Sequence, residues 1–245
     1  MQGIQSVPVA TTTPVQGAVP VFDAVPGKYD IRQLTQDDIA AGFAITSFAG
    51  GSTVETGATV TNPSFTASYS SLPTSAAITN TAGMGSPLAL ITPFTSGTVV
   101  GAFTLSAPGS ITFTLTAHQN SLVKTATQAI AFQDRGFGGI GAAGATSATA
   151  SGNNAVLNGG AGTLADSFLA ANFVGTSFGP FSPVSQVIYI LLPPGAHTFK
   201  DQNGFGFPMT AVATFSFVNQ EGATVPMTLW ASNTVSSPFT VTVAT

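Results

Sequence analysis

The sequence predicts a mainly β protein made of two antiparallel β-sandwich modules, preceded by an extended N-terminal arm and one short helix. From about Ile45 onward, apolar residues recur with a period of two, as in "ITFTL", where Ile111, Phe113 and Leu115 share a face. Such threonine-rich stretches are separated by turns rich in glycine, proline, asparagine and serine, a pattern typical of antiparallel sandwiches. Threonine suits a half-exposed pleated face because its side chain is branched at Cβ.

The arm is predicted from proline spacing within residues 1–44. Four prolines recur every six residues among valine, threonine, glutamine and glycine (Pro8, Pro14, Pro20 and Pro26). Proline lacks a backbone N–H donor and favours extended conformations. Two interpretations of the arm stay open: a floppy tail, or a segment that becomes ordered on a neighbouring subunit.

The short helix is predicted for residues 30–44, "DIRQLTQDDIAAGFA". Apolar residues approximate one helical face and two aspartates the other (Ile31, Leu34, Ile39 and Phe43 against Asp37 and Asp38). We interpret this segment as a docking element that joins the arm to the body of the protein.

The first sandwich is expected over residues 45–138, with the turn "APGS" between a strand at Phe103 and the strand from Ile111. Residues 139–166 are rich in glycine, alanine, serine and asparagine. Because such a composition can hardly supply a core, they are predicted to be a linker or a long loop.

The second β domain is expected over residues 167–245. The apolar run "VIYILL", 187–192, predicts a buried strand that ends before two prolines. "NQEG", 219–222, predicts the turn of a hairpin, and "SPFTVTVAT" predicts a closing strand.

The composition excludes several classes of protein. Charged residues make up 6% of the chain, against about 25% in a typical soluble domain. Disorder is not indicated, because the chain is 44% hydrophobic with a net charge of −4. No apolar run approaches the roughly 20 residues of a membrane helix, so we predict no membrane insertion. Five Lys and Arg residues form no basic patch, so we predict no direct nucleic-acid binding.

The same composition favours an assembly. A nearly neutral surface tends to associate, which indicates faces covered by neighbouring subunits. The absence of cysteine from the sequence excludes disulfides and thiolate chemistry. The N-terminus lacks the basic and then apolar pattern of a secretory signal.

Candidates for catalysis or metal binding are few. The two histidines, His118 and His197, could form a metal site with Asp134 or Asp201, but the helpful local spacings are absent. "DRGFGGIGAAG", 134–144, partly mimics a phosphate-binding loop, yet no helical segment follows it and it has no P-loop lysine. We therefore predict no catalytic residue, no cofactor, no metal site and no enzymatic activity.

The order of the motifs resembles structural proteins of tailed bacteriophages. "FAGGSTVETGATVTNPSFTASYSSLPTSAAITN", 48–80, is similar to the V-E-x-G-x-T-V opening of their immunoglobulin-like module, and "GSITFTLTAHQNSLVKTATQAIAFQDRGFGG" to its closing strands. "VSQVIYILLPPGAHTFKDQNGF" and the late "WASN" strand resemble the region that follows it. The chain departs from the pattern in its "ETGA" and in its long glycine-rich segment 139–166.

The resemblance implies immunoglobulin-like or jelly-roll-like sandwiches in a non-enzymatic virion protein: a tail, baseplate, fibre or capsid-surface component. Its partners would be copies of itself and other virion proteins. An alternative function is a receptor-binding module of a virion that recognises a host-surface glycan or protein. The ligand-facing residues would then be aromatic (Tyr189, Phe205, Phe207 and Trp230). A cell-surface adhesin or surface-layer subunit is a further alternative, but it should carry a secretion signal.

Glu55 is the only charged residue between Asp38 and Lys124. A carboxylate at a turn can accept backbone N–H bonds. We expect Glu55 to tie the first strand to its neighbour around Gly57; the alternative is an exposed turn glutamate.

Overall fold

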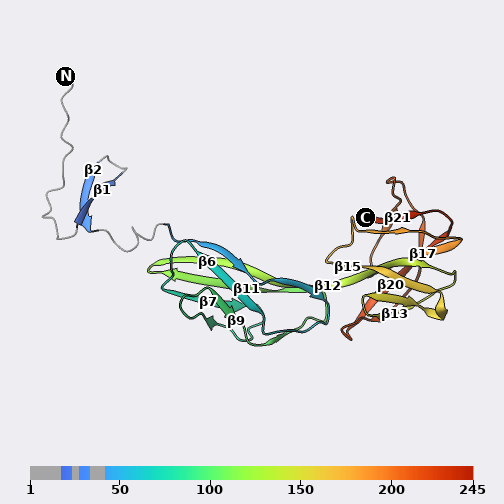
Figure 1. Cartoon of the computed structure of the whole chain (residues 1–245), viewed down its shortest axis with the longest axis horizontal. Helices are drawn as coiled ribbons and strands as arrows, with labels where there is room; N and C mark the ends of the chain where they lie inside the picture. Colours follow the sequence, from blue (N-terminus) through green and yellow to red (C-terminus); the bar gives the residue numbers. More distant parts are fainter. Residues whose placement is uncertain (1–17, 24–27, 34–41, 245) are drawn as a thin grey trace, which may run out of the picture.

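The structure, a computed structural model, describes residues 18–23, 28–33 and 42–244, and the prediction of a mainly β chain is confirmed. Figure 1 shows two β regions that follow one another along the long axis, both reached by the strand β12 (Leu122–Gly141). Buried core residues fall into one cluster within residues 43–132 and two within residues 137–243. We call these parts the first and second β regions. Within the described ranges, no helix is long and apolar enough to cross a membrane.

Two sheets and a small two-stranded ladder build the first β region. Its strands are β3 (Ile45–Ala49), β4 (Ser52–Glu55), β5 (Val60–Thr61), β6 (Ser64–Tyr69), β7 (Ser75–Asn80), β8 (Leu88–Ala89), β9 (Ser96–Thr98), β10 (Ala102–Phe103), β11 (Gly109–Gln119) and the first part of β12. One sheet has the order β3-β6-β9, and the other has the order β8-β7-β11-β12 with β4 parallel to β12. The chain bends at residues 106–108, at the start of the predicted "APGS" turn, but the strands on either side do not pair with each other: β10 pairs with β5, and β11 pairs with β7 and β12.

Phenylalanine rings fill the core between these two sheets. Phe65 of β6 lies 4.6 Å from Phe113 of β11, measured between ring centroids. Phe48 and Phe103 extend the cluster at 5.5 Å from Phe65 and 5.3 Å from Phe113. Because β6 and β11 belong to different sheets, these contacts hold the sheets together, and aromatic burial contributes most per residue to such cores.

A seven-stranded sheet dominates the second β region, with a three-stranded sheet beside it. Its elements after β12 are β13 (Ala148–Ser151), β14 (Asn154–Leu157), η2 (Asn158–Gly160), β15 (Gly162–Ala170), β16 (Ser177–Phe181), β17 (Gln186–Leu192), β18 (Thr198–Lys200), β19 (Met209–Val218), β20 (Thr224–Val235) and β21 (Phe239–Ala244). The large sheet has the order β13-β14-β15-β12-β17-β20-β19, and the small one β16-β21-β18.

Strand β17 contains the apolar run "VIYILL", 187–192, and its position between two core clusters explains why the run is unbroken. Val187, Tyr189 and Leu191 point into one core cluster, while the residues between them point into the other. A strand buried on both faces reads as a continuous apolar run. The predicted hairpin around "NQEG" is also confirmed, because β19 and β20 pair from Val218 and Thr224 outward.

The linker predicted for residues 139–166 is wrong. These residues include the end of β12, β13, β14 and the first half of β15, which are all strands of the large sheet, and the short helix η2 between β14 and β15. The glycines of β12 do not loosen the chain; they leave room for close neighbours. A Cβ at Gly138 would lie 2.6 Å from the Phe178 ring, and one at Gly139 would lie 2.5 Å from the carbonyl oxygen of Thr163. The small residues therefore permit close packing that larger side chains would block.

The helix predicted for residues 30–44 is wrong for its first turn. Residues Lys28–Gln33 form β2, which pairs antiparallel with β1 (Ala18–Asp23), and residues 34–41 lie outside the described residues. "KYDIRQ" alternates charged or polar residues with Tyr29 and Ile31, a period of two that favours a strand. The rest of the expected arm, residues 1–17 and 24–27, also lies outside the described part, so its order stays a prediction.

Candidate functional site

The candidate site lies where β12 passes from the first β region into the second. Strand β4 runs beside β12 with Glu55 opposite Gln133, and the backbone N–H of Thr56 donates to the Gln133 carbonyl at 2.9 Å. The turn after β4 thereby meets the β19–β20 turn of the second region. There the side-chain amide of Asn219 donates to the Thr56 carbonyl at 2.6 Å. We call the contacts between these two turns and β12 the junction.

An ion pair occupies the centre of the junction. Arg135 Nε donates to Glu55 Oε2 at 3.2 Å, and Arg135 Nη1 donates to the Ser167 hydroxyl at 3.3 Å. The Glu55 side chain is 3% exposed, so the carboxylate is not the exposed turn glutamate of the alternative interpretation. The Arg135 guanidinium binds this carboxylate, in place of the backbone N–H groups expected for it. The pair connects β4 of the first region to β12 and, through Ser167, to β15 of the second.

Gly57 lies at the closest approach of the two turns. Its φ of +90° is a conformation that L side chains rarely adopt, and a Cβ there would overlap the side chain of Ala223. Its backbone N–H donates to the Leu105 carbonyl at 2.8 Å. Glycine is therefore required both by the turn and by its neighbour across the junction.

Asn219 organises the opposite turn. Its side-chain oxygen accepts the backbone N–H groups of Glu221, at 3.1 Å, and Ala223, at 2.9 Å. Since its amide also donates to Thr56, a single buried side chain closes its own turn and fixes it to the other.

Two buried carboxylates lie close to the junction, and both titrate above their ordinary range. Burial raises the pKa of Glu55, and the Arg135 guanidinium offsets this only in part. Burial likewise raises the pKa of Asp134, and the nearby Thr56 hydroxyl lowers it by a smaller amount. Neither that hydroxyl oxygen nor Asp134 Oδ1 has a well-aligned hydrogen bond. Desolvation therefore outweighs attraction at both groups.

This arrangement predicts that the protein gains stability on mild acidification. Because the folded pKa values lie above the unfolded values of about 4.5 for Glu55 and 3.8 for Asp134, the folded chain binds more protons between them. Stability should therefore rise as pH falls from neutral through the raised pKa values, and the gain is complete only below the unfolded values, about 3.8 for Asp134. Asp134→Asn should be more stable than the wild type at pH 7 and should show a weaker pH dependence. Denaturant midpoints at pH 7 and pH 5 measure both effects. If the midpoint changed by the same amount between the two pH values in the variant and the wild type, the assignment to Asp134 would be contradicted.

The residues weighed for metal binding come together only in part: His197 and Asp134 line one small pocket, while His118 and Asp201 lie elsewhere. His118 lies within β11 of the first region, whereas His197 lies in the second and its Nε2 is 3.1 Å from the Pro193 carbonyl. Asp201 accepts the backbone N–H groups of Asn203 and Phe205, both at 2.9 Å, as the carboxylate of a turn. Across the described ranges, no group of three metal-ligating side chains was found.

The four aromatic residues considered for ligand binding do not share a surface. Tyr189 is 1% exposed, and its hydroxyl donates to the Ala142 carbonyl at 2.9 Å, so it is a core residue and not a ligand-facing one. Trp230 packs with the rings of Phe199 and His197 at 5.3 and 6.0 Å in the other core cluster. Phe207 packs 4.4 Å from Phe239. Only Phe205 projects into solvent, with 71% of its surface exposed.

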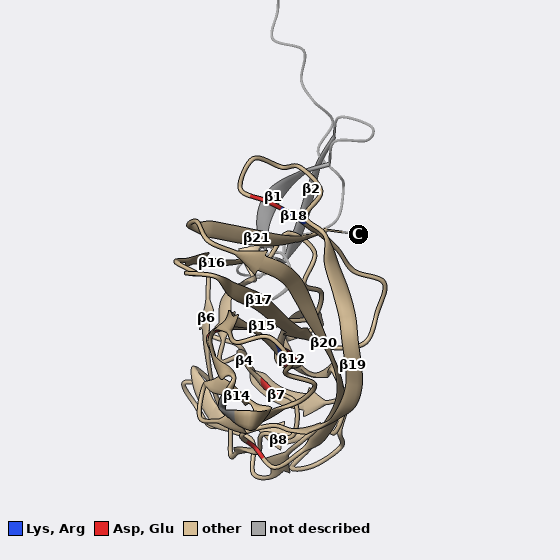
Figure 2. Ribbon diagram, turned by 90° about the vertical axis from the view of Figure 1, so that its right-hand side faces the viewer, with Lys and Arg blue, Asp and Glu red and all other residues tan. Residues whose placement is uncertain are grey.

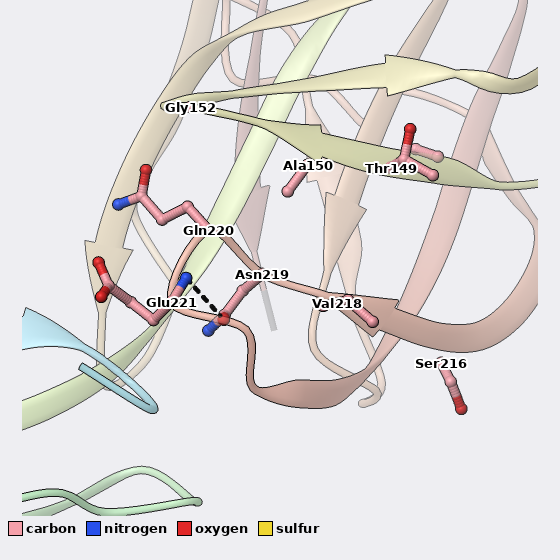
Figure 3. Close-up of a pocket in the computed structure, with 9 residues that line it drawn as sticks. Thr149, Ala150, Gly152, Ser216, Val218, Asn219, Gln220 and Glu221 are labelled. Atoms are coloured by element: carbon pink, nitrogen blue, oxygen red, sulfur yellow. Dashed lines mark hydrogen bonds between the residues drawn. The ribbon is translucent and has the colours of Figure 1, made fainter. Parts of the chain in front are cut away.

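A depression of about 770 Å³ opens beside the junction (Figure 3). One wall is β13, with Thr149 and Ala150, and the other is the end of β19 with its following turn. The only charged residue in its lining is Glu221. Its walls therefore offer hydroxyls, side-chain amides, one carboxylate and small apolar groups.

Sequence reasoning missed the partners of Glu55. Arg135 is one of only five cations in the chain and stands between an aspartate and a glycine in "QDRGFGG". Asp134 and Arg135 are the only charged residues between Lys124 and Asp166, and a cation in such an uncharged stretch was a signal that a buried acid required it. Asn219 was identified only as a turn residue, and nothing in its local sequence indicates that it reaches Thr56, 163 positions away in the chain.

The chain was compared with protein-family models and with curated protein sequences. No family model matches it, and no curated protein matches it significantly.

Proposed function

We propose that this chain is a non-enzymatic structural protein of a bacteriophage virion that acts by assembling with copies of itself and with other virion proteins. In this proposal the two β regions are immunoglobulin-like or jelly-roll-like sandwich modules, and the chain is a tail, baseplate, fibre or capsid-surface component. Its location is the virion.

The observation that carries the proposal is an exposed surface with few charges and several large apolar groups. Ile91, Val184 and Phe205 are 85%, 80% and 71% exposed. Figure 2 shows a side of the molecule on which acidic positions are few and separated by long uncharged stretches. Burial of such a surface against neighbours stabilises an assembly without desolvating charges.

The test is the mass of the purified chain in solution, measured by light scattering with and without residues 1–29. We expect a defined oligomer for the full chain and a smaller species for the truncated one. A monomer in both cases, at every concentration tested, would contradict self-assembly through the arm.

Phe205 supports a second candidate, recognition of a host-surface glycan or protein. The Asp201 carboxylate holds the loop through two backbone bonds and leaves the ring exposed. An exposed aromatic ring on a fixed loop can anchor a partner. The test should use the whole chain, because β12 lies at the centre of the large sheet and is missing from a fragment such as 160–245. Binding to host cells that Phe205→Ala abolishes would favour this candidate.

A further inference from the structure

The chain contains two asparagine-glycine pairs, Asn158-Gly159 and Asn203-Gly204. In such a pair the backbone nitrogen of the glycine can attack the side-chain amide carbon of the asparagine, because glycine has no Cβ to block the approach. Asparagine is for this reason among the residues that limit the chemical lifetime of a protein. The surroundings of each pair decide whether the side chain and the backbone can reach the geometry of attack.

The side chain of Asn158 is held in place. Its Oδ1 accepts the backbone N–H groups of Thr146, at 2.8 Å, and Ser147, at 3.1 Å. Its Nδ2 donates to the Thr146 hydroxyl at 3.2 Å. All three hydrogen bonds must break before the Asn158 Cγ can turn toward the Gly159 nitrogen, so the fold protects this pair.

The pair Asn203-Gly204 lies at the tip of the loop that carries Phe205. Asn203 is exposed, and no hydrogen bond holds its side chain within the part of the chain that the structure describes. A Cβ at Gly204, whose φ is +84°, would meet no atom within 4 Å, so water has free access to this position. The Gly204 N–H donates to the Asp201 carbonyl at 3.0 Å, and this exposed bond has to open before the nitrogen attacks. Such bonds at loop tips open most easily.

We propose that Asn203 is a site of spontaneous deamidation and that Asn158 is protected from it. The Gly204 nitrogen forms a bond to Asn203 Cγ, the bond from Cγ to Nδ2 breaks, and ammonia leaves with the proton of the Gly204 N–H. Water then opens the resulting five-membered succinimide at either carbonyl, which gives aspartate or isoaspartate. The net reaction consumes one water and releases one ammonia, and it requires no other reactant.

Deamidation would change the loop around Phe205. Either product adds a negative charge two residues from Asp201, whose carboxylate accepts the backbone N–H groups of Asn203 and Phe205. Isoaspartate also lengthens the backbone by one atom, inside the turn in which the Asp201 N–H donates to the Phe205 carbonyl at 2.8 Å. The loop should therefore loosen as the protein ages, and amide hydrogen exchange at Phe205 should be faster in the converted chain. This inference goes beyond the proposed function and holds whether or not Phe205 binds a partner.

Peptide mapping of the whole folded chain tests the proposal. The chain is incubated at mildly alkaline pH, below its unfolding temperature, and is then digested with trypsin. Cleavage after Arg135 and Lys200 places Asn158 and Asn203 in separate fragments, and mass spectra follow the conversion of each asparagine. A second sample, incubated in guanidinium chloride, shows the rates that the local sequence alone allows when neither pair is held by the fold.

We expect Asn203 in the folded chain to convert at least roughly tenfold faster than Asn158, because three side-chain hydrogen bonds restrain Asn158. In denaturant the two rates should agree within about threefold, since both pairs are then released from the fold. Equal rates in the folded chain would overturn the inference. The matched control variant is Asn203→Gln, because the longer amide forms its ring far more slowly. If the fragment with residue 203 converted as fast in this variant, another amide would be the site, and the inference would also fail.

Discussion

Gly139→Ala is expected to destabilise the second β region by about 3 kcal/mol, the upper end of the range for overpacking a close-packed core. The added methyl group would lie 2.5 Å from the Thr163 carbonyl oxygen and 2.7 Å from the Leu164 Cα. Both are backbone atoms of β15, so no rotation of a side chain can relieve the contact. The loss is measured as a shift of the denaturant midpoint.

Gly206→Ala is the matched control for this substitution. A Cβ at Gly206 would have no atom within 4 Å, so its stability should stay within about 0.5 kcal/mol of the wild type. If the two variants were equally stable, the close approach of β12 and β15 would not be the reason for the glycine.

Arg135→Met is expected to destabilise the protein by about 3–5 kcal/mol at pH 7, because it leaves the Glu55 carboxylate buried without its charge partner. The loss should shrink as pH falls, since protonation of Glu55 removes the unpaired charge. Denaturant unfolding at pH 7 and pH 5 measures both parts of this expectation.

The double variant Arg135→Met, Glu55→Gln separates charge from packing. It leaves a neutral amide in place of the carboxylate and should recover most of the lost stability. If the double variant were as unstable as Arg135→Met alone, the methylene groups of Arg135, and not its charge, would be the stabilising part.

The sequence predicts correctly those strands whose signal lies in a few adjacent residues. It does not predict structure that depends on contacts with residues distant in the chain. The unbroken apolar run of β17 identifies a strand buried on both faces, and "NQEG" identifies a hairpin, because a few adjacent residues carry each signal. The glycines of β12, taken from the sequence alone, predict a flexible linker, whereas in the structure they permit close packing. Their role becomes clear only beside Phe178 and Thr163, which are distant in sequence.

The junction was predictable only in part. The isolation of Glu55 along the chain indicated that its charge had a specific purpose. The identity of its partner depends on the parallel pairing of β4 with β12, which joins segments about 80 residues apart and leaves no local pattern. The first turn of the expected helix failed for a different reason. In "KYDIRQ" two periodicities compete, and pairing with β1 selects the strand.

The shared strand β12 has a mechanical consequence. Twenty residues of extended chain span about 65 Å, and they are hydrogen-bonded first to β11 and β4 and then to β15 and β17. No linker separates the β12 pairs of the first β region from those of the second. A force applied along β12 in one region is therefore transmitted as shear to the hydrogen bonds of β12 in the other region. Under tension the two β regions should unfold together in one step. Two domains joined by a flexible linker would instead unfold one after the other.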